Sequence, residues 1–483
     1  MTKCPFCQCE INQSNVLYYF DHKISKDSFS EQLSKIYRGV FLNHNRVEQG
    51  HGYVSFWSER SGLHEPHGAQ GFVLCTDELD ELAGAVGVKV KNGVYDFGNC
   101  CVDLSGDTPF IKSGTMTYRP TALACPDCEN LLPLDYLSSK CVNIALVGSS
   151  KTGKTTMLLS LLSDNFRNLT GQCEGKLKVT RSFDCTDGYV RKFWDRMLSG
   201  FQENGRIPDA SDQPLPPLFL RMEWELPQGG QFSHNLCLID TQGDVFQDDE
   251  RAKKTLSLLE TCDGILYCVD PSQSISARGK GTTAKSNKGI APGTAIGRPV
   301  IAPPAGAVSP EKNSASGDPA MIYERYFRTD RRWEGKKCAF VLTKLDKYID
   351  ISTKYDIIIN EFPYGRFLTT SSGVPSEREE LFDFSGSVYR QMVAQAVFQK
   401  EFPTMPTPSN CAFKSPAYFA VSSFSGDALP DKTKGKGLYV KDRQKRNCLF
   451  VHEPLMWLLS EIVPDLRRQE FEELSSRLIK SNA

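Results

Sequence analysis

The stretch that most constrains the fold lies at residues 141–162, where an apolar run, a polar turn and a leucine-rich segment follow one another directly. The run CVNIALV has the length and composition of a buried strand, and TMLLSLL continues with the pattern of a helix. The turn between them reads GSSKTGKT. A strand that passes through a short turn into a helix is typical of α/β proteins with a largely parallel sheet.

Later apolar runs extend this alternation, and helical patterns separate several of them. The runs lie at residues 219–226, 234–241, 264–270, 338–346 and 418–424. The sequence therefore predicts an α/β fold whose sheet is flanked by helices. The first two runs are joined by the short segment PQGGQFS, which favours an antiparallel hairpin at the edge of the sheet.

The turn at residues 148–155 matches the Walker A pattern, and its place between a strand and a helix supports the motif. In such a turn, backbone N–H groups and the positive end of the helix dipole face phosphate oxygens. We expect Lys154 to neutralise the β- and γ-phosphates and the Thr155 hydroxyl to bind Mg²⁺. The residues expected to contact nucleotide here are Gly148, Ser149, Ser150, Lys151, Thr152, Gly153, Lys154, Thr155 and Thr156.

A second motif, DTQG at residues 240–243, follows the run that ends in LCLID. At the end of a strand, Asp240 can hold Mg²⁺ through water, and the N–H group of Gly243 can face the γ-phosphate. These two residues complete the predicted phosphate and metal site.

A third motif, TKLD, ends a later apolar run and bears on the choice of base. Asp346 can accept two hydrogen bonds from N1–H and N2–H₂ of guanine, which adenine does not offer. The stem of Lys344, beside Thr343, can cover the base. Ser422 and Ser423 follow a further apolar run at residues 417–421.

The motifs GSSKTGKT, DTQG and TKLD, in this order, resemble those of Ras-like, TRAFAC-type P-loop GTPases. The resemblance implies that GTP or GDP binds together with Mg²⁺. It also implies that Ser422 and Ser423 lie in a backbone loop against the guanine. The chain departs from the best-known members at Asp244, where they carry the glutamine that orients the attacking water. Gln242, inside the motif, is a candidate for that role. The alternative is that it is a polar residue facing solvent.

Lys151 is a further catalytic candidate beside Lys154 and Gln242. Its ammonium could stabilise the charge that develops on the bridging β–γ oxygen, acting as a cation built into the chain. The alternative is a solvated loop lysine. The sequence does not identify the switch residue that would bind Mg²⁺. Ser211 is a candidate to replace the usual threonine.

Two Cys-Pro-x-Cys segments predict a separate metal site. Cys4 and Cys7 form the first pair, and Cys125 and Cys128 form the second. Four thiolates make a closed tetrahedral shell, so the expected zinc ion is structural. Cys9, Cys100 and Cys101 could supply alternative ligands. By default, we expect these three cysteines to be free thiols. The glycine-rich, alternating stretch between the two pairs predicts a mostly β insertion.

These features divide the chain into two regions. Residues 1–138 form the predicted split zinc ribbon with its β-rich insertion, and residues 139–483 form the P-loop GTPase domain. Within the second region, residues 276–319 are rich in Gly, Pro, Ala, Ser and Lys, so we expect disorder there. The last segment predicts an amphipathic helix that is interrupted near Pro464 and packs on the sheet.

The charge balance argues against a nucleic-acid partner, because 57 Lys and Arg residues nearly cancel 58 Asp and Glu residues. The first residues, MTKCPFCQCE, lack the pattern of a secretory signal, and no apolar run approaches the roughly 18 residues that span a bilayer. We therefore expect a cytoplasmic protein without a membrane span. The 17 cysteines would then be thiols or metal ligands.

The whole combination resembles the bacterial double-GTPase-type domain family. The features that carry this resemblance are the split zinc ribbon, TGKTT, DTQGD, TKLD and the EPLMWLL segment at residues 453–459. The resemblance implies a protein partner, such as a companion GTPase, and a role in antiphage defence or another bacterial conflict system. An oligomer is also compatible with it.

The predicted function is a GTP-hydrolysing molecular switch in which residues 171–217 and 243–250 respond to the γ-phosphate. Hydrolysis should be slow without a partner, because the sequence offers no obvious glutamine or arginine finger. Two alternatives stay open. One is a nucleotide-dependent scaffold with negligible hydrolysis, and the other is a zinc-ribbon ATPase that binds nucleic acid.

Overall fold

The computed structural model describes the chain in segments, and the structural statements below concern these segments. They are residues 2–5, 7, 9–20, 72–75, 79, 83–84, 87–96, 100–106, 108–127, 131–163, 177–181, 189–208, 215, 217–225, 231–270, 319–345, 391, 394–399, 402, 405–414, 416–424, 428–430, 437–440 and 450–463. The predictions for Asp346, Cys128, Ser211 and nearly all of residues 276–319 therefore lie outside the described residues.

A seven-stranded sheet forms the centre of the larger region, in the order β13-β15-β16-β12-β17-β18-β19. Its strands are β12 (Lys140–Val147), β13 (Leu177–Arg181), β15 (Leu218–Glu225), β16 (Gln231–Asp240), β17 (Gly264–Val269), β18 (Lys337–Leu342) and β19 (Ala417–Ala420). Strand β12 pairs in parallel with both β16 and β17, and the parallel pairing continues to β18 and β19. Strand β15 alone runs opposite to the other six, and it pairs antiparallel with both β13 and β16. The predicted α/β fold with a mostly parallel sheet is thus confirmed.

The burial of the central strands explains their continuous apolar runs. Every residue of β17 and β19 is buried, and so is nearly every residue of β18. Strands covered on both faces cannot alternate polar and apolar residues without burying the polar ones. Their covering helices are α4 (Lys154–Ser163), α6 (Tyr189–Asn204), α7 (Asp249–Thr261), α9 (Pro319–Tyr326) and α14 (Glu453–Ile462).

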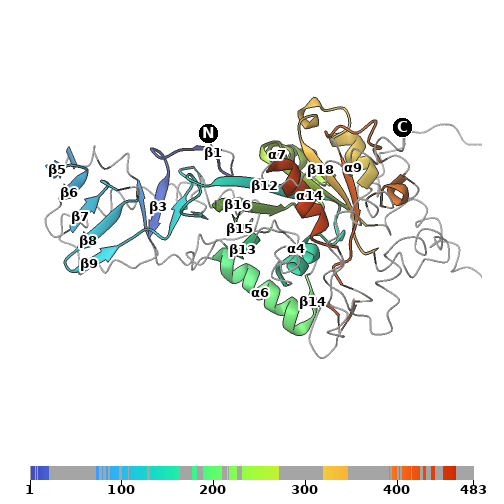
Figure 1. Cartoon of the computed structure of the whole chain (residues 1–483), viewed down its shortest axis with the longest axis horizontal. Helices are drawn as coiled ribbons and strands as arrows, with labels where there is room; N and C mark the ends of the chain where they lie inside the picture. Colours follow the sequence, from blue (N-terminus) through green and yellow to red (C-terminus); the bar gives the residue numbers. More distant parts are fainter. Residues whose placement is uncertain are drawn as a thin grey trace, which may run out of the picture.

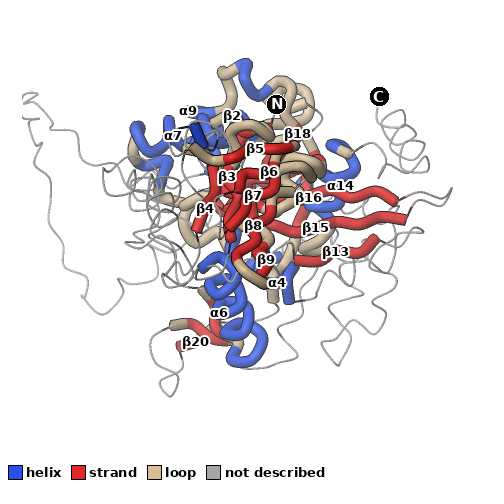
Figure 2. The backbone as a smooth tube through the Cα atoms, turned by 90° about the vertical axis from the view of Figure 1, so that its left-hand side faces the viewer, coloured by secondary structure: helices blue, strands red, loops and turns tan. Residues whose placement is uncertain are grey.

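The helices lie on both sides of the sheet. In Figure 1, α4 and α6 lie below β13, β15 and β16, whereas α7 lies above β12, and Figure 2 also shows α4 and α6 apart from α7 and α9. Helix α14 packs on β17, β18 and β19, as predicted for the C-terminal segment. None of the helices in the described segments is long and apolar enough to cross a membrane.

The hairpin of β15 and β16 is antiparallel as predicted, but its predicted place at the sheet edge is wrong. Strand β13 pairs outside β15 and forms that edge instead. Helix α6 follows β13, so residues 171–217 contain regular elements as well as loops. The sequence LKVTR of β13 is short and carries two basic residues, which hid its strand character.

In the described part of the N-terminal region, the regular structure is mainly β. A small ribbon joins β1 (Thr2–Lys3) to β2 (Glu10–Ile11), and a four-stranded sheet has the order β11-β10-β3-β4. The strands of that sheet are β3 (Leu17–Phe20), β4 (Phe72–Cys75), β10 (Ala122–Ala124) and β11 (Leu131–Leu132). A separate antiparallel sheet of five strands, β5 to β9, covers residues between Lys89 and Tyr118 and lies at one end of the molecule (Figure 1).

Tyr136 joins the N-terminal region to the seven-stranded sheet. Its side chain is only 1% exposed, and its hydroxyl donates to the carbonyl oxygen of Lys3 at 2.8 Å. Its ring packs edge-on against Phe219 of β15, with ring centroids 6.4 Å apart. Next to it, Asp135 forms an ion pair with Arg221 of the same strand. The two regions therefore share one continuous core.

Removing the Tyr136 hydroxyl tests this connection. We expect Tyr136→Phe to lower the free energy of unfolding by about 1 kcal/mol, because the hydrogen bond between its buried side chain and the carbonyl oxygen of Lys3 is lost. Urea denaturation followed by fluorescence measures this change. Leu134→Ala, in the same loop but exposed, is the control and should change stability by less than about 0.5 kcal/mol. An unaltered midpoint for Tyr136→Phe would show that the hydrogen bond does not stabilise the connection.

Candidate functional site

The turn at residues 148–155 curls tightly at the carboxyl end of β12. A Cβ atom on Gly148 would lie 2.3 Å from the carbonyl oxygen of Cys268 in β17, so only glycine fits there. Lys151 and Gly153 both have left-handed backbone conformations, with φ of 65° and 88°. These conformations reverse the chain between the strand and α4 without a long loop.

Lys154 is the buried charge at the centre of this turn. Its Nζ donates to the carbonyl oxygens of Gly148 at 2.9 Å and Ser149 at 3.1 Å. Burial lowers the pKa of the ammonium group, while the nearby carboxylate of Asp240 acts in the opposite direction. A buried ammonium with only carbonyl and hydroxyl partners on its own turn is suited to exchange them for an anion.

Thr155 and Asp240 meet beside this lysine. The Thr155 hydroxyl donates to Oδ2 of Asp240 at 2.5 Å. The other oxygen, Oδ1, is buried and has no hydrogen-bond partner among the described residues. Burial raises the pKa of this carboxyl, whereas Lys154 and the Thr155 hydrogen bond lower it. A hydroxyl and a carboxylate in this position can together bind a hard divalent cation.

The pairing of β12 with β16 brings these residues together. Leu146 is directly opposite Asp240 in the parallel register, and the N–H group of Thr241 donates to the carbonyl oxygen of Leu146 at 3.1 Å. Two residues later, a Cβ atom on Gly243 would lie 2.2 Å from the backbone nitrogen of Ser150. The DTQG segment thus lies directly on the 148–155 turn.

The segment of the third motif also touches this turn. Thr343 donates from Oγ1 to the carbonyl oxygen of Thr152 at 2.5 Å, and Lys344 donates from Nζ to that of Lys151 at 2.9 Å. Lys344 also forms an ion pair with Asp270, whose carboxylate is almost completely buried. Asp270 was not among the predicted site residues, although it ends the apolar run GILYCVD and is therefore a carboxylate at a strand end.

The remaining predicted contacts are placed as follows. Ser422 is fully buried and donates to the carbonyl oxygen of Phe424 at 2.5 Å. The carbonyl oxygen of Ser423 accepts from the hydroxyl of Ser160 in α4 at 2.8 Å, so this segment is tied to the helix that follows the turn. The Lys151 side chain is exposed, and its catalytic role stays a prediction.

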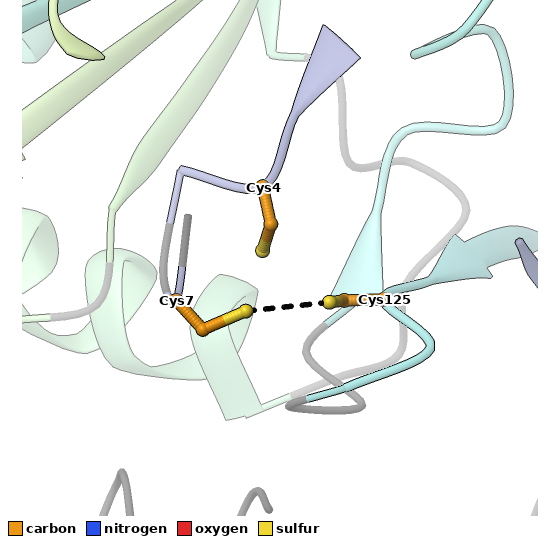
Figure 3. Close-up of side chains that lie close together, drawn as sticks. All are labelled: Cys4, Cys7 and Cys125. Carbon is orange, nitrogen blue, oxygen red and sulfur yellow. Dashed lines mark hydrogen bonds between the residues drawn. The ribbon is translucent and has the colours of Figure 1, made fainter. Parts of the chain in front are cut away.

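Three cysteine sulfurs come together in the N-terminal region. The thiols of Cys4, Cys7 and Cys125 all lie within 4.8 Å of one another, and Figure 3 shows them pointing toward a common centre. The sulfurs of Cys7 and Cys125 are 3.5 Å apart although 118 residues separate them in the sequence. Such a group of thiols can bind a metal ion such as zinc.

A fourth cysteine, Cys9, lies beside this cluster. Its sulfur is 3.1 Å from that of Cys125, and its carbonyl oxygen accepts from the N–H group of Cys4 at 2.9 Å. Cys9 is not part of the three-thiol group, so the free thiol expected by default is not contradicted, although this thiol lies beside the cluster. The spacing CxxCxC was the available signal. Cys101, the other alternative, lies on β7 (Cys100–Asp103) and does not belong to the cluster.

No protein-family model and no curated protein matches this chain. The functional assignment therefore depends on the chemistry of the two sites themselves.

The cysteine cluster predicts a bound metal. We expect purified protein to contain about one zinc ion per chain, and Cys125→Ser to lose most of it, because a thiolate ligand is removed. Mass spectrometry of the metal content measures both values. Cys101→Ser is the control and should keep the parent's zinc. A parent without metal, or a Cys125→Ser variant with full occupancy, would contradict the site.

The contact of Gly243 with the turn predicts a local loss of stability. We expect Gly243→Ala to lower the free energy of unfolding by about 1–3 kcal/mol, because its Cβ collides with backbone rather than with a mobile side chain. Gly335→Ala is the matched control, since nothing lies within 4 Å of its Cβ position. Chemical denaturation compares the two variants, and equal midpoints would show that the segments do not pack as described.

Proposed function

We propose that this chain binds GTP with Mg²⁺ at the 148–155 turn and hydrolyses it, as a molecular switch of the Ras-like P-loop GTPase class. The observation that carries the proposal is the convergence of Lys154, Thr155, Asp240 and Gly243 at the carboxyl ends of β12 and β16. Sites at the carboxyl ends of parallel strands are the usual ligand sites of α/β proteins.

The unsatisfied polar groups of this site support a phosphate and metal ligand. Asp240 leaves one buried carboxylate oxygen without a partner among the described residues, and such an oxygen is costly unless it meets a cation or donor. Mg²⁺ would take the Thr155 hydroxyl directly and Asp240 through water. Lys154 would then exchange its carbonyl partners for phosphate oxygens.

Guanine as the base is proposed from Asp346, whose side chain the sequence places at the end of the third motif. The described part of that motif supports the proposal, because Thr343 and Lys344 both bond to the 148–155 turn. The pair of Lys344 with Asp270 would hold the lysine stem in one conformation, which suits a side chain that covers a flat base.

The regulatory part of the proposal comes from the resemblance to the bacterial double-GTPase-type domain family. We propose slow hydrolysis that a protein partner, such as a companion GTPase, accelerates, in antiphage defence or a related conflict system. The shared core at Tyr136 supports a role of the metal-binding region in reporting the nucleotide state, because it touches the same hairpin that ends at Asp240.

Base selection is the test of this function. We expect the parent to bind GTP at least tenfold more tightly than ATP, and Asp346→Asn to lose GTP affinity and gain XTP affinity, since xanthine offers an acceptor where guanine offers a donor. Asp96→Asn is the control and should change nothing, because Asp96 is the exposed last residue of β6 (Val94–Asp96) in the N-terminal region. Calorimetry measures the affinities.

A parent that prefers ATP, or an Asp346→Asn variant that gains nothing for XTP, would contradict guanine recognition. Phosphate release by the same samples separates a slow GTPase from a scaffold that binds GTP without hydrolysing it.

A further inference from the structure

Three side chains beside the 148–155 turn form a connected polar group: Gln242, Asp244 and Arg251. Arg251 donates from Nη2 to Oε1 of Gln242 at 2.9 Å. It also forms an ion pair with Asp244, from Nη1 to Oδ2 at 3.2 Å and from Nη2 to Oδ1 at 3.3 Å. Asp244 and Arg251 are partly exposed, whereas Gln242 is only 8% exposed.

The backbone holds this arginine in place. Arg251 lies in the first turn of α7, and Asp248 caps that helix by accepting from the N–H groups of Glu250 and Arg251. A capped helix start keeps the Cα position of Arg251 constant relative to the preceding DTQG segment. The fork to Asp244 then limits the directions that the guanidinium can take.

This arrangement determines how the Gln242 carboxamide is oriented. An arginine only donates hydrogen bonds, so the atom that faces it must be the carbonyl oxygen, and the amide cannot be flipped. The other end, Nε2, is buried and has no hydrogen-bond partner among the described residues. A buried donor without an acceptor is costly, which points to a ligand that supplies one.

The neighbours of Gln242 indicate where that ligand lies. Asp240, two residues earlier, accepts from Thr155, and Gly243, the next residue, packs on the backbone of Ser150. Gln242 therefore stands between two points of contact with the 148–155 turn. An acceptor bound in that turn is therefore a candidate partner for Nε2, and phosphate oxygens are strong acceptors.

We propose that Asp244 and Arg251 clamp the carboxamide of Gln242 so that its Nε2 donates to the terminal phosphate of a bound nucleoside triphosphate. The inference rests on the proposed function, because it needs phosphates in the 148–155 turn. Gln242 then distinguishes triphosphate from diphosphate, and Arg251 is a positioning residue. Asp244, where related enzymes are expected to carry glutamine, holds the arginine that supports Gln242.

The affinity ratio between a non-hydrolysable GTP analogue and GDP tests the proposal on the full chain with Mg²⁺. Gln242→Glu keeps an acceptor for Arg251 but replaces the Nε2 donor by a carboxylate oxygen that repels phosphate. We expect it to weaken analogue binding by about tenfold or more and GDP binding by less than about twofold. Arg251→Ala should lower the same ratio by about threefold to tenfold, and Arg251→Lys should restore part of it.

Arg325→Ala is the matched control. Arg325, on α9, forms an ion pair at 2.8 Å with Asp249, which lies at the start of α7. Arg325 does not contact Gln242. It should leave the ratio unchanged, and melting curves of all variants exclude unfolding as the cause of a loss.

An unchanged affinity ratio in Gln242→Glu overturns the proposal. A tighter analogue complex in Arg251→Ala also overturns it, because Arg251 would then hold Gln242 away from the ligand. A parent that binds both nucleotides while the variants keep its ratio refutes only the role of Gln242. A parent that binds neither nucleotide refutes the proposed function together with it.

Discussion

The parallel pairing of β12 with β16 is the constraint on which the rest of the site depends. Its register sets Leu146 opposite Asp240, so the turn after one strand and the DTQG segment after the other begin at the same level. The close approach of Gly243 to Ser150 follows from this register. A shift by one residue would turn Asp240 to the other face of the sheet, because side chains alternate along a strand.

The polar groups at the carboxyl ends of β12 and β16 lack some of their hydrogen-bond partners within the described residues. Lys154 donates hydrogen bonds to carbonyl oxygens of its own turn. Within the described residues, Oδ1 of Asp240 and Nε2 of Gln242 are buried and have no hydrogen-bond partner. Buried polar groups are normally paired, and clusters of exceptions are typical of places where a ligand completes the structure. The surrounding sheet is apolar and densely packed, and its strands can hold these groups in place at a cost in stability.

The cysteine cluster has a structural relation to this site through Tyr136. The tyrosine reaches Lys3, next to Cys4, with its hydroxyl and packs against Phe219 of β15 with its ring. Strand β15 is the hairpin partner of β16, which ends at Asp240. A metal ion that holds Cys4, Cys7 and Cys125 together would therefore stabilise the core on which β15 rests, and loss of the metal would loosen it.

Local patterns determined much of this protein. The apolar runs of β12, β17, β18 and β19 could be predicted because strands buried on both faces need continuous apolar residues, and Lys154 with Thr155 could be predicted because short spacing alone places them at a helix start. Only the tertiary structure decided which distant groups meet. It brought Cys9 to Cys125, Arg251 to Gln242 and Asp270 to Lys344, and it placed β13 at the sheet edge. Such contacts depend on strand register and on packing between segments far apart in the chain, and no local periodicity records either.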